Sequence, residues 1–273
     1  MCYRYSNRQE EAEFRQHMKQ IGRALRESGG EKRFEFFHTN GFAHEELPVI
    51  TQEKPDEISY MYWGLIPSGV KSHADKVKYW KMGYTLNARS EEIFQTWSFK
   101  NNIKDHRCLI PATGFFEWRD VSKEKYPYLI QIKSRDFPDD TESFCFAGVY
   151  DHWIDKDTGE VIDGFAIITV EANPMMKNIH VNLKRPDNGG RMPVIIEEKD
   201  YDTWLSPKAT FEDLDNIMQP YDQEKMQAYT ISKMITSRSI DPNAPGTLQF
   251  YLYPELGREV AFNVNAQPPL GSE

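Results

Sequence analysis

Apolar residues recur with a helical period near the start of the chain. Between Gln9 and Glu27 they are spaced three or four positions apart, at Phe14, Met18, Ile21 and Leu25, with charged residues between them. This spacing puts the apolar side chains on one face and predicts an amphipathic helix. Two consecutive glycines at 29–30 would end it.

Most other apolar segments are short and rich in aromatic and β-branched residues, which is typical of strands. They cover residues 57–67, 107–118, 125–133, 143–154, 164–172, 191–195 and 226–235. Polar segments rich in turn-forming residues separate several of them. Shorter helical patterns lie at 90–100, 174–180, 197–207 and 210–218, and the first of these would begin at Ser90. Residues 248–263 show no clear period.

This order of elements predicts the fold class α+β. We expect a single domain over residues 1–273, mostly an antiparallel β-sheet that closes into a barrel-like core with flanking helices. The chain is 39% hydrophobic, which is enough for a large core. Apolar runs fall short of the roughly 18 residues of a membrane span, and the N-terminus lacks a signal-peptide pattern. We therefore expect a cytoplasmic protein without a membrane partner.

Charge and cysteine content narrow the classes of function. The net charge of −9 argues against extensive contact with phosphates, although Lys71, Lys76, Lys78, Lys81 and Arg89 could line a local basic groove. Three cysteines without CxxC spacing argue against a disulfide framework or a zinc site. Nucleotide-binding, serine-hydrolase and zinc-protease motifs do not occur. We expect neither a metal nor a cofactor.

Cys2 is the cysteine with a claim to reactivity, since Cys108 and Cys145 lie in strand-like runs where a thiol packs as a small hydrophobe. If Met1 is removed, Cys2 carries an α-amine and a thiol on neighbouring carbons. Such an aminothiol condenses with an aldehyde to an imine and then closes a thiazolidine ring. The alternative is that a cysteine at position 2 has no function.

Further candidates are scattered along the chain. Glu117 lies among Phe115, Phe116 and Trp118, where lost solvation would favour the protonated carboxyl that a general acid needs; alternatively, its head reaches water. His180 follows a helical turn and could exchange a proton near neutral pH, or be structural. Asn87 and Arg89 precede the helix predicted at 90, and Arg89 could bind phosphate or Glu91. The pattern alone does not join these residues.

Eight segments in the same order resemble the SOS-response-associated peptidase (SRAP) family, whose members crosslink to abasic sites in single-stranded DNA. They are MCYR, GFAHEELPVIT, YWGLIP, LNARSE, RCLIPATGFFEW, FAGVYD, FAIITVEAN, and IH followed by RMPVI, within about residues 1–205. The resemblance implies one SRAP domain with a basic groove for single-stranded DNA, completed by the C-terminal part of the chain.

The resemblance also implies roles for individual residues. Removal of Met1 would expose Cys2, which would capture the aldehyde of an abasic site, with associated lyase and self-processing peptidase activity. Glu117 would act as general acid and base, His180 would transfer a proton, and Asn87 would hold Cys2 and the sugar. The DNA contacts would be Arg4, Arg89 and Arg191 at phosphates and Trp118 at unstacked bases. The resemblance further implies a monomer, associated with the nucleoid when bound to DNA, with replication-fork proteins as candidate partners.

Two departures from the family pattern accompany these expectations. Residues 181–190 are inserted between His180 and Arg191, and we expect a surface excursion whose Lys184 and Arg185 lie near DNA. Val170 stands where many relatives carry threonine, which removes a polar group from the site. The alternative functions are an N-terminal-nucleophile cysteine peptidase or amidohydrolase, and a non-enzymatic binder of single-stranded DNA.

Overall fold

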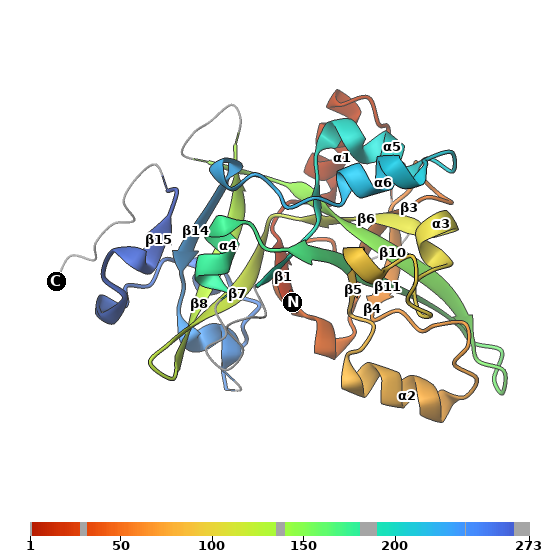
Figure 1. The fold of residues 1–273 in the computed structure, drawn as a ribbon, viewed down its shortest axis with the longest axis horizontal. Coiled ribbons are helices and arrows are strands. Elements are labelled where there is room, and N and C mark those ends of the chain that lie inside the picture. Colours follow the sequence, from red (N-terminus) through yellow and green to blue (C-terminus); the bar gives the residue numbers. More distant parts are fainter. Residues whose placement is uncertain (1, 28–31, 135–139, 181–189, 238, 265–273) are drawn as a thin grey trace.

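The computed structural model describes residues 2–27, 32–134, 140–180, 190–237 and 239–264, and its strands form two sheets that lie side by side (Figure 1). The first sheet is open and antiparallel, in the order β15-β14-β8-β7-β1-β2, with β9 also paired to β8. Its strands are β1 (Arg4–Asn7), β2 (Phe36–Asn40), β7 (Gly114–Val121), β8 (Glu124–Lys133), β9 (Thr141–Glu142), β14 (Met226–Thr230) and β15 (Ala261–Phe262).

The second sheet closes on itself. Strands β11, β4, β3, β6 and β10 pair in that order, and β10 pairs back with β11, which makes a five-stranded barrel. Short strands β5 and β12 pair with β11, and β13 pairs with β10. The strands are β3 (Glu46–Thr51), β4 (Ser59–Trp63), β5 (Asn87–Arg89), β6 (Arg107–Ala112), β10 (Phe144–Ile154), β11 (Val161–Glu171), β12 (Arg191–Pro193) and β13 (Ile195–Ile196).

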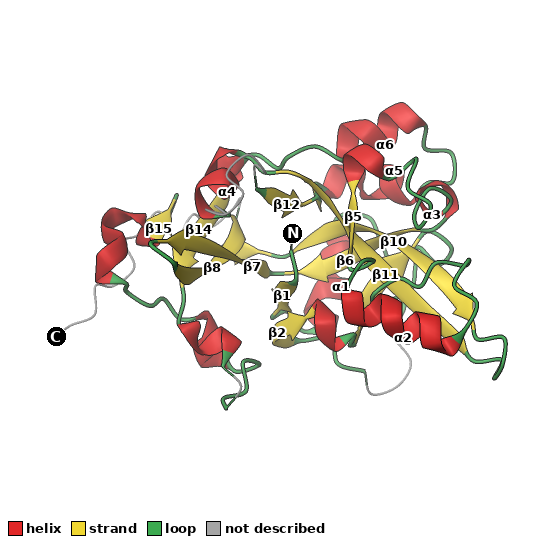
Figure 2. Ribbon diagram, turned by 60° about the horizontal axis from the view of Figure 1, so that its bottom comes forward, coloured by secondary structure: helices red, strands yellow, loops and turns green. Residues whose placement is uncertain are grey.

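Helices flank both sheets, as Figure 2 shows. They are α1 (Glu11–Gln20), α2 (His73–Met82), α3 (Asn102–Asp105), α4 (Pro174–Ile179), α5 (Tyr201–Leu205) and α6 (Phe211–Ile217). Single 3₁₀ turns include η1 (Gly41–Ala43), η2 (Ser90–Glu92) and η5 (Lys233–Thr236). The α+β class with a barrel-like core and flanking helices is therefore confirmed. None of the described helices is both long and apolar enough to cross a membrane.

Two predicted helices are wrong in extent. The helix predicted over residues 9–27 ends early because Gly22 adopts a φ of 88°, the left-handed conformation that commonly ends helices. Leu25 is still buried, but outside the helix. The helix predicted over 90–100 is only the η2 turn followed by further turns. Trp97, expected on its buried side, is 52% exposed.

Two predicted strands end earlier than expected. The strand predicted over 226–235 stops at Thr230, where Ser232 caps the η5 turn by accepting a hydrogen bond from the Met234 amide at 3.2 Å. The strand predicted over 57–67 covers only β4. The segment without a clear period, 248–263, supplies the short edge strand β15.

An aromatic cluster joins the two sheets. The Tyr5 ring on β1 lies 5.3 Å from the Trp63 ring on β4 and 5.6 Å from the Phe146 ring on β10, both edge-on. Phe115 on β7 also contacts Phe146, with 6.0 Å between ring centroids. All four side chains are fully buried. Edge-to-face pairs of this kind contribute about 0.5–1.5 kcal/mol each beyond the area they bury, so the cluster stabilises the packing of one sheet against the other.

Arg107 on β6 is a buried cation, 1% exposed, and it anchors α3 and α5 to the barrel. Its Nε donates to the Trp204 carbonyl at 2.7 Å, Nη2 to Ser206 at 2.5 Å, and Nη1 to Ile103 at 2.8 Å and to Lys104. These carbonyls lie near the C-terminal ends of α3 and α5, where backbone carbonyls have no hydrogen-bond donor within their own helix.

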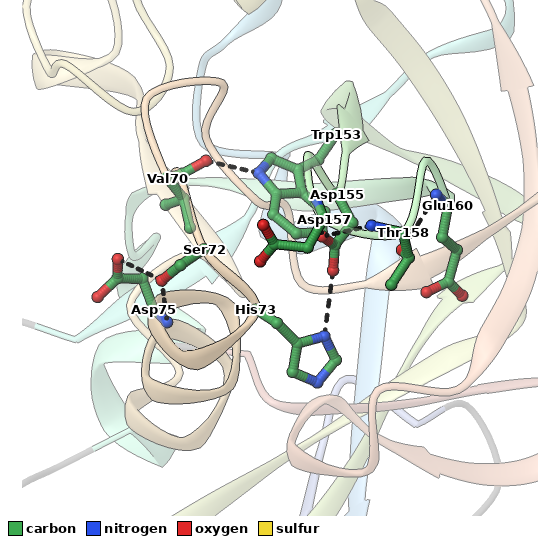
Figure 3. A network of polar contacts seen from close by, with 9 residues as sticks. All are labelled: Val70, Ser72, His73, Asp75, Trp153, Asp155, Asp157, Thr158 and Glu160. Atoms are coloured by element: carbon green, nitrogen blue, oxygen red, sulfur yellow. Dashed lines mark hydrogen bonds and ion pairs between the residues drawn. The ribbon is translucent and has the colours of Figure 1, made fainter.

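A polar network fastens α2 to the hairpin between β10 and β11 (Figure 3). The buried Asp155 carboxylate accepts hydrogen bonds from the Asp157 and Thr158 amides at 2.9 and 3.4 Å. Its second oxygen lies 3.3 Å from Nδ1 of His73, the first residue of α2. The Trp153 indole on β10 donates to the Val70 carbonyl at 2.7 Å, so the chain just before α2 is held against the hairpin as well.

Candidate active site

The start of the chain lies between the two sheets (Figure 2). Cys2 lies two residues before β1, which is paired on one side with β2 and on the other with β7, where Tyr5 is opposite Phe115. Glu117 lies two residues further along β7, so its side chain is on the same face of the strand as that of Phe115. Continued towards the N-terminus, this register would put Tyr3 opposite Glu117, and the Glu117 charge acts on the neighbouring Cys2 thiol.

The Cys2 side chain is fully buried, and its thiol donates a long hydrogen bond to the Arg4 carbonyl at 3.5 Å. Burial and, secondarily, the negative charge of Glu117 raise the pKa of the Cys2 thiol. The sulfur is therefore protonated at neutral pH and needs a base before it can act as a nucleophile. Cys108 and Cys145 are also buried, as expected for packing residues.

A cavity of about 390 Å³ opens beside Tyr3 and Arg4, and the fully buried Cys2 is not among the residues that line it. Four of the predicted site residues line it: Arg4, Glu117, Trp118 and His180. The sequence did not indicate the others, which are Tyr3, Asn40, Phe42, Asp120, Lys125 and Thr236. Tyr3 stands inside the MCYR segment and could have been found there. Thr236 carried no signal, because only the fold brings η5 to the N-terminus.

His180 and Glu117 face each other in this cavity. His180 Nδ1 lies 3.5 Å from Glu117 Oε2 and 3.1 Å from the carbonyl oxygen of Arg191. A carbonyl only accepts hydrogen bonds, so Nδ1 carries the proton and Nε2 is the basic nitrogen. Glu117 is 4% exposed, so the alternative in which its carboxyl reaches bulk water is wrong.

Asn87 approaches Cys2 from the barrel side. It lies on β5 opposite Ile167 of β11, and its Nδ2 donates to the Cys2 carbonyl at 2.9 Å. The Oδ1 atom is buried and has no hydrogen-bond donor within the described part of the chain. A buried acceptor left in this state is a place where a ligand's N–H or O–H group can bind.

Arg4 connects this cavity to a second one of about 570 Å³, which Asn40 and Thr236 also line. Its guanidinium lies 5.4 Å from the Trp118 ring centroid, and Nη1 donates to the Ile235 carbonyl at 3.1 Å. Nη1 also lies 3.0 Å from His38 Nε2. Burial and the Arg4 charge lower the pKa of His38 to about 4, so its ring is neutral and accepts this bond.

The other two predicted phosphate contacts do not line the cavity. Arg89 lies 3.7 Å from Glu92 and is 48% exposed. Glu91, the alternative partner expected for Arg89, instead accepts two hydrogen bonds from Arg191 at 2.6 and 2.8 Å. Thr169 holds the same guanidinium, with its hydroxyl accepting from Nε at 3.1 Å and its carbonyl accepting from Nη2 at 2.7 Å.

The structure describes one of the two departures from the family pattern. Residues 181–189 of the insertion, with Lys184 and Arg185, lie outside the described residues, and the description resumes at Gly190. Val170 is buried opposite Met192 of β12. The hydroxyl in this strand belongs to its neighbour, Thr169, which donates to the Ala88 carbonyl at 3.2 Å.

The basic residues between 71 and 89, predicted as a local groove, differ in their exposure to solvent. Lys76 is buried, with its ammonium 5.0 Å from the Trp80 ring centroid, whereas Lys71, Lys78 and Lys81 are exposed. Among the described residues, no cluster of three or more His, Cys, Asp or Glu side chains could hold a metal ion.

Two solved structures have a similar architecture. A protein from Bacteroides thetaiotaomicron has the same fold with a TM-score of 0.77 and 34% identity, covering 92% of this chain and 100% of that one. A Bordetella bronchiseptica protein shares the fold alone, with a TM-score of 0.66 at 23% identity, covering 85% of this chain and 100% of the other.

The chain belongs to the SOS response associated peptidase (SRAP) family, whose model matches residues 1–238. Abasic site processing protein YoqW of Bacillus subtilis is 34% identical over 194 residues, which span 70% of this chain and 76% of the relative. Abasic site processing protein HMCES of Xenopus tropicalis is 31% identical over 153 residues, spanning 51% of this chain and 42% of that protein.

Proposed function

We propose that this protein processes abasic sites in single-stranded DNA by forming a covalent crosslink through Cys2 after Met1 is removed. The observation that carries the proposal is a cavity in which Glu117 faces His180, with Cys2 buried behind its lining residues Tyr3 and Arg4 and within reach of the Glu117 charge. The names of the relatives YoqW and HMCES give the substrate class. The whole of residues 1–273 would act as one domain, because β14 and β15 extend the sheet that holds β1.

The reaction needs no external oxidant or reductant. The α-amine of Cys2 adds to the C1′ aldehyde of the ring-opened sugar, and the carbinolamine loses water to give an imine. The thiol sulfur then adds to the imine carbon, and its proton passes to the nitrogen. A C–N and a C–S bond form, one water leaves, and a thiazolidine remains.

Each proton transfer has a group near it. Glu117 takes the proton of the Cys2 thiol, which burial and that carboxylate keep protonated at rest. It also serves the opening of the sugar ring, together with Nε2 of His180. The orphaned Oδ1 of Asn87 accepts from the amine or from a sugar hydroxyl. Escape of the imine by loss of the proton at C2′ would break the bond from C3′ to its phosphate, which is the lyase activity.

Few positively charged side chains would contact the DNA. Arg4 and Trp118 lie together at the cavity wall, with the indole available to a displaced base and the guanidinium to a phosphate. Arg89 and Arg191 add contacts beside the cavity, Arg191 only after it exchanges Glu91 for a phosphate. Binding should therefore depend only modestly on salt, on the order of a few counterions.

Denaturing gel electrophoresis tests the proposal. Protein whose intact mass shows that it begins at Cys2 is mixed with a single-stranded oligonucleotide that carries one abasic site. We expect a heat-stable band of reduced mobility, absent with Cys2→Ala and with a tetrahydrofuran analogue that has no aldehyde. Cys145→Ala, which removes another buried thiol, is the matched control and should crosslink normally.

A second variant separates the two bonds. Cys2→Ser keeps the α-amine but loses the thiol, so its adduct should survive heating only after borohydride reduction of the imine. No band from protein shown to begin at Cys2 would refute the crosslinking function. A peptidase that forms an acyl-enzyme would not be trapped by borohydride. Release of Met1 from a Cys2→Ala variant would show that its removal does not need the Cys2 thiol.

A further inference from the structure

Gly190 makes an unusually close contact with the residue proposed to transfer protons. Gly190 is buried immediately before β12 and lies directly against His180. A Cβ atom added at Gly190 would lie 2.9 Å from the Cβ of His180, 3.0 Å from its carbonyl oxygen and 3.3 Å from Cγ. Glycine is therefore the residue that permits this approach.

The backbone at this point is held on its other side. The Gly190 carbonyl accepts from the Ala172 amide at 2.9 Å, and Arg191 is paired with Glu171 across the β11–β12 ladder. The Arg191 side chain is fastened to Glu91 and Thr169. Because β12 cannot retreat, an added methyl group would displace His180.

The close approach has a chemical consequence for the imidazole. It brings the Arg191 carbonyl within 3.1 Å of His180 Nδ1, closer than the Glu117 carboxylate at 3.5 Å, and both acceptors favour the tautomer that is protonated at Nδ1. Nε2 is then the nitrogen that can take or give a proton within the cavity. A backbone carbonyl that orients a catalytic histidine commonly controls its function in this way.

We propose that Gly190 is a positioning residue for His180. Because it has no side chain, the Arg191 carbonyl can approach His180 and set the tautomer and direction of the imidazole. The kinetic part of this inference rests on the proposed function of His180 in crosslinking. The structural part stands without it.

Nitrogen-15 NMR of the histidine rings tests the structural part. The chain has seven histidines, and His180 is assigned as the ring signal lost in His180→Ala. We expect the Nδ1-protonated tautomer in the wild-type protein and a shift towards Nε2 protonation in Gly190→Ala. An Nε2-protonated ring in the wild type would overturn the proposal, even if Gly190→Ala failed to fold; so would an unchanged ring in that variant.

Crosslinking kinetics test the functional part. Under single-turnover conditions Gly190→Ala should react roughly 10- to 100-fold more slowly, as a displaced catalytic group does, while binding of the unreactive tetrahydrofuran DNA changes less than about twofold. In a His180→Ala background the same change should have no further effect. A further loss there would show that Gly190 acts otherwise.

Gly246→Ala is the matched control, because a Cβ there meets nothing within 4 Å. It should leave both the rate and the His180 ring signals at their wild-type values. A wild-type chain that forms no crosslink would refute the proposed function, whereas the ring spectrum would still decide the role of Gly190.

Discussion

Replacing Asn87 by aspartate would keep the shape of the side chain but exchange its amide donor for a charged acceptor, a change that the control below shares. Its Nδ2 group now donates to the Cys2 carbonyl at 2.9 Å, and both residues are buried. A carboxylate oxygen at the same place accepts but cannot donate, so the carbonyl loses its partner. The cost of an unpaired buried group is about 1–3 kcal/mol. If the lost bond orients Cys2 in the transition state, crosslinking should slow by about 5- to 150-fold.

The assay is single-turnover crosslinking to abasic single-stranded DNA, quenched and resolved on denaturing gels. Asn102→Asp is the control, since Asn102 is equally buried and its Nδ2 donates to the Tyr150 carbonyl at 2.7 Å, away from the cavity. Both variants should lose stability to a similar extent in urea, but only Asn87→Asp should lose rate. Equal rates for Asn87→Asp and wild type, or equal slowing by Asn102→Asp, would refute the reasoning.

Three more outcomes follow from the contacts described. Arg107→Met should lower the free energy of unfolding in urea by about 3 kcal/mol or more, because four helix-end carbonyls lose their donor at about 1–3 kcal/mol each; a loss below about 1 kcal/mol would contradict this. Burial and Arg4 lower the pKa of His38 to about 4, so on acidification the unfolded chain takes up a proton on this histidine before the folded chain does. The free energy of unfolding should therefore fall by on the order of 3 kcal/mol as the pH drops from about 6.5 to about 4. His38→Gln should flatten that part of the pH profile of unfolding, and an unchanged slope would disprove the assignment. Glu91→Gln should free Arg191 for a phosphate and steepen the log–log salt dependence of binding to single-stranded DNA by about 0.7; an unaltered slope would mean that Arg191 makes no phosphate contact.

The elements that the sequence predicted well are those whose pattern is local. The runs at 107–118, 125–133, 143–154 and 164–172 became β6 with the start of β7, then β8, β10 and β11, because each alternates or concentrates large apolar residues over a full strand. The pattern failed to predict where an element ends when a single residue determines its end. The left-handed Gly22 shortened the first helix, and the Ser232 cap ended β14.

The candidate site divides in the same way. Cys2, Asn87, Glu117 and His180 come from four separate segments, and no local pattern indicates that they meet; the family resemblance supplied that link, and the geometry is consistent with it. Arg191 shows the limit of such a transfer. Its partner Glu91 is about a hundred positions away, so the ion pair depends on β5 and β12 lying on opposite sides of β11.

The aromatic cluster between the sheets has a practical meaning for protein engineering. Cys2 and Glu117 belong to the open sheet, while Asn87 and the strand that contacts His180 belong to the barrel. The gap between these halves is set by the rings of Tyr5, Phe115 and Phe146. A repacked core that raised the melting temperature could therefore alter the site without any change within it. A library confined to these positions tests this, because it leaves every residue proposed to contact DNA unchanged.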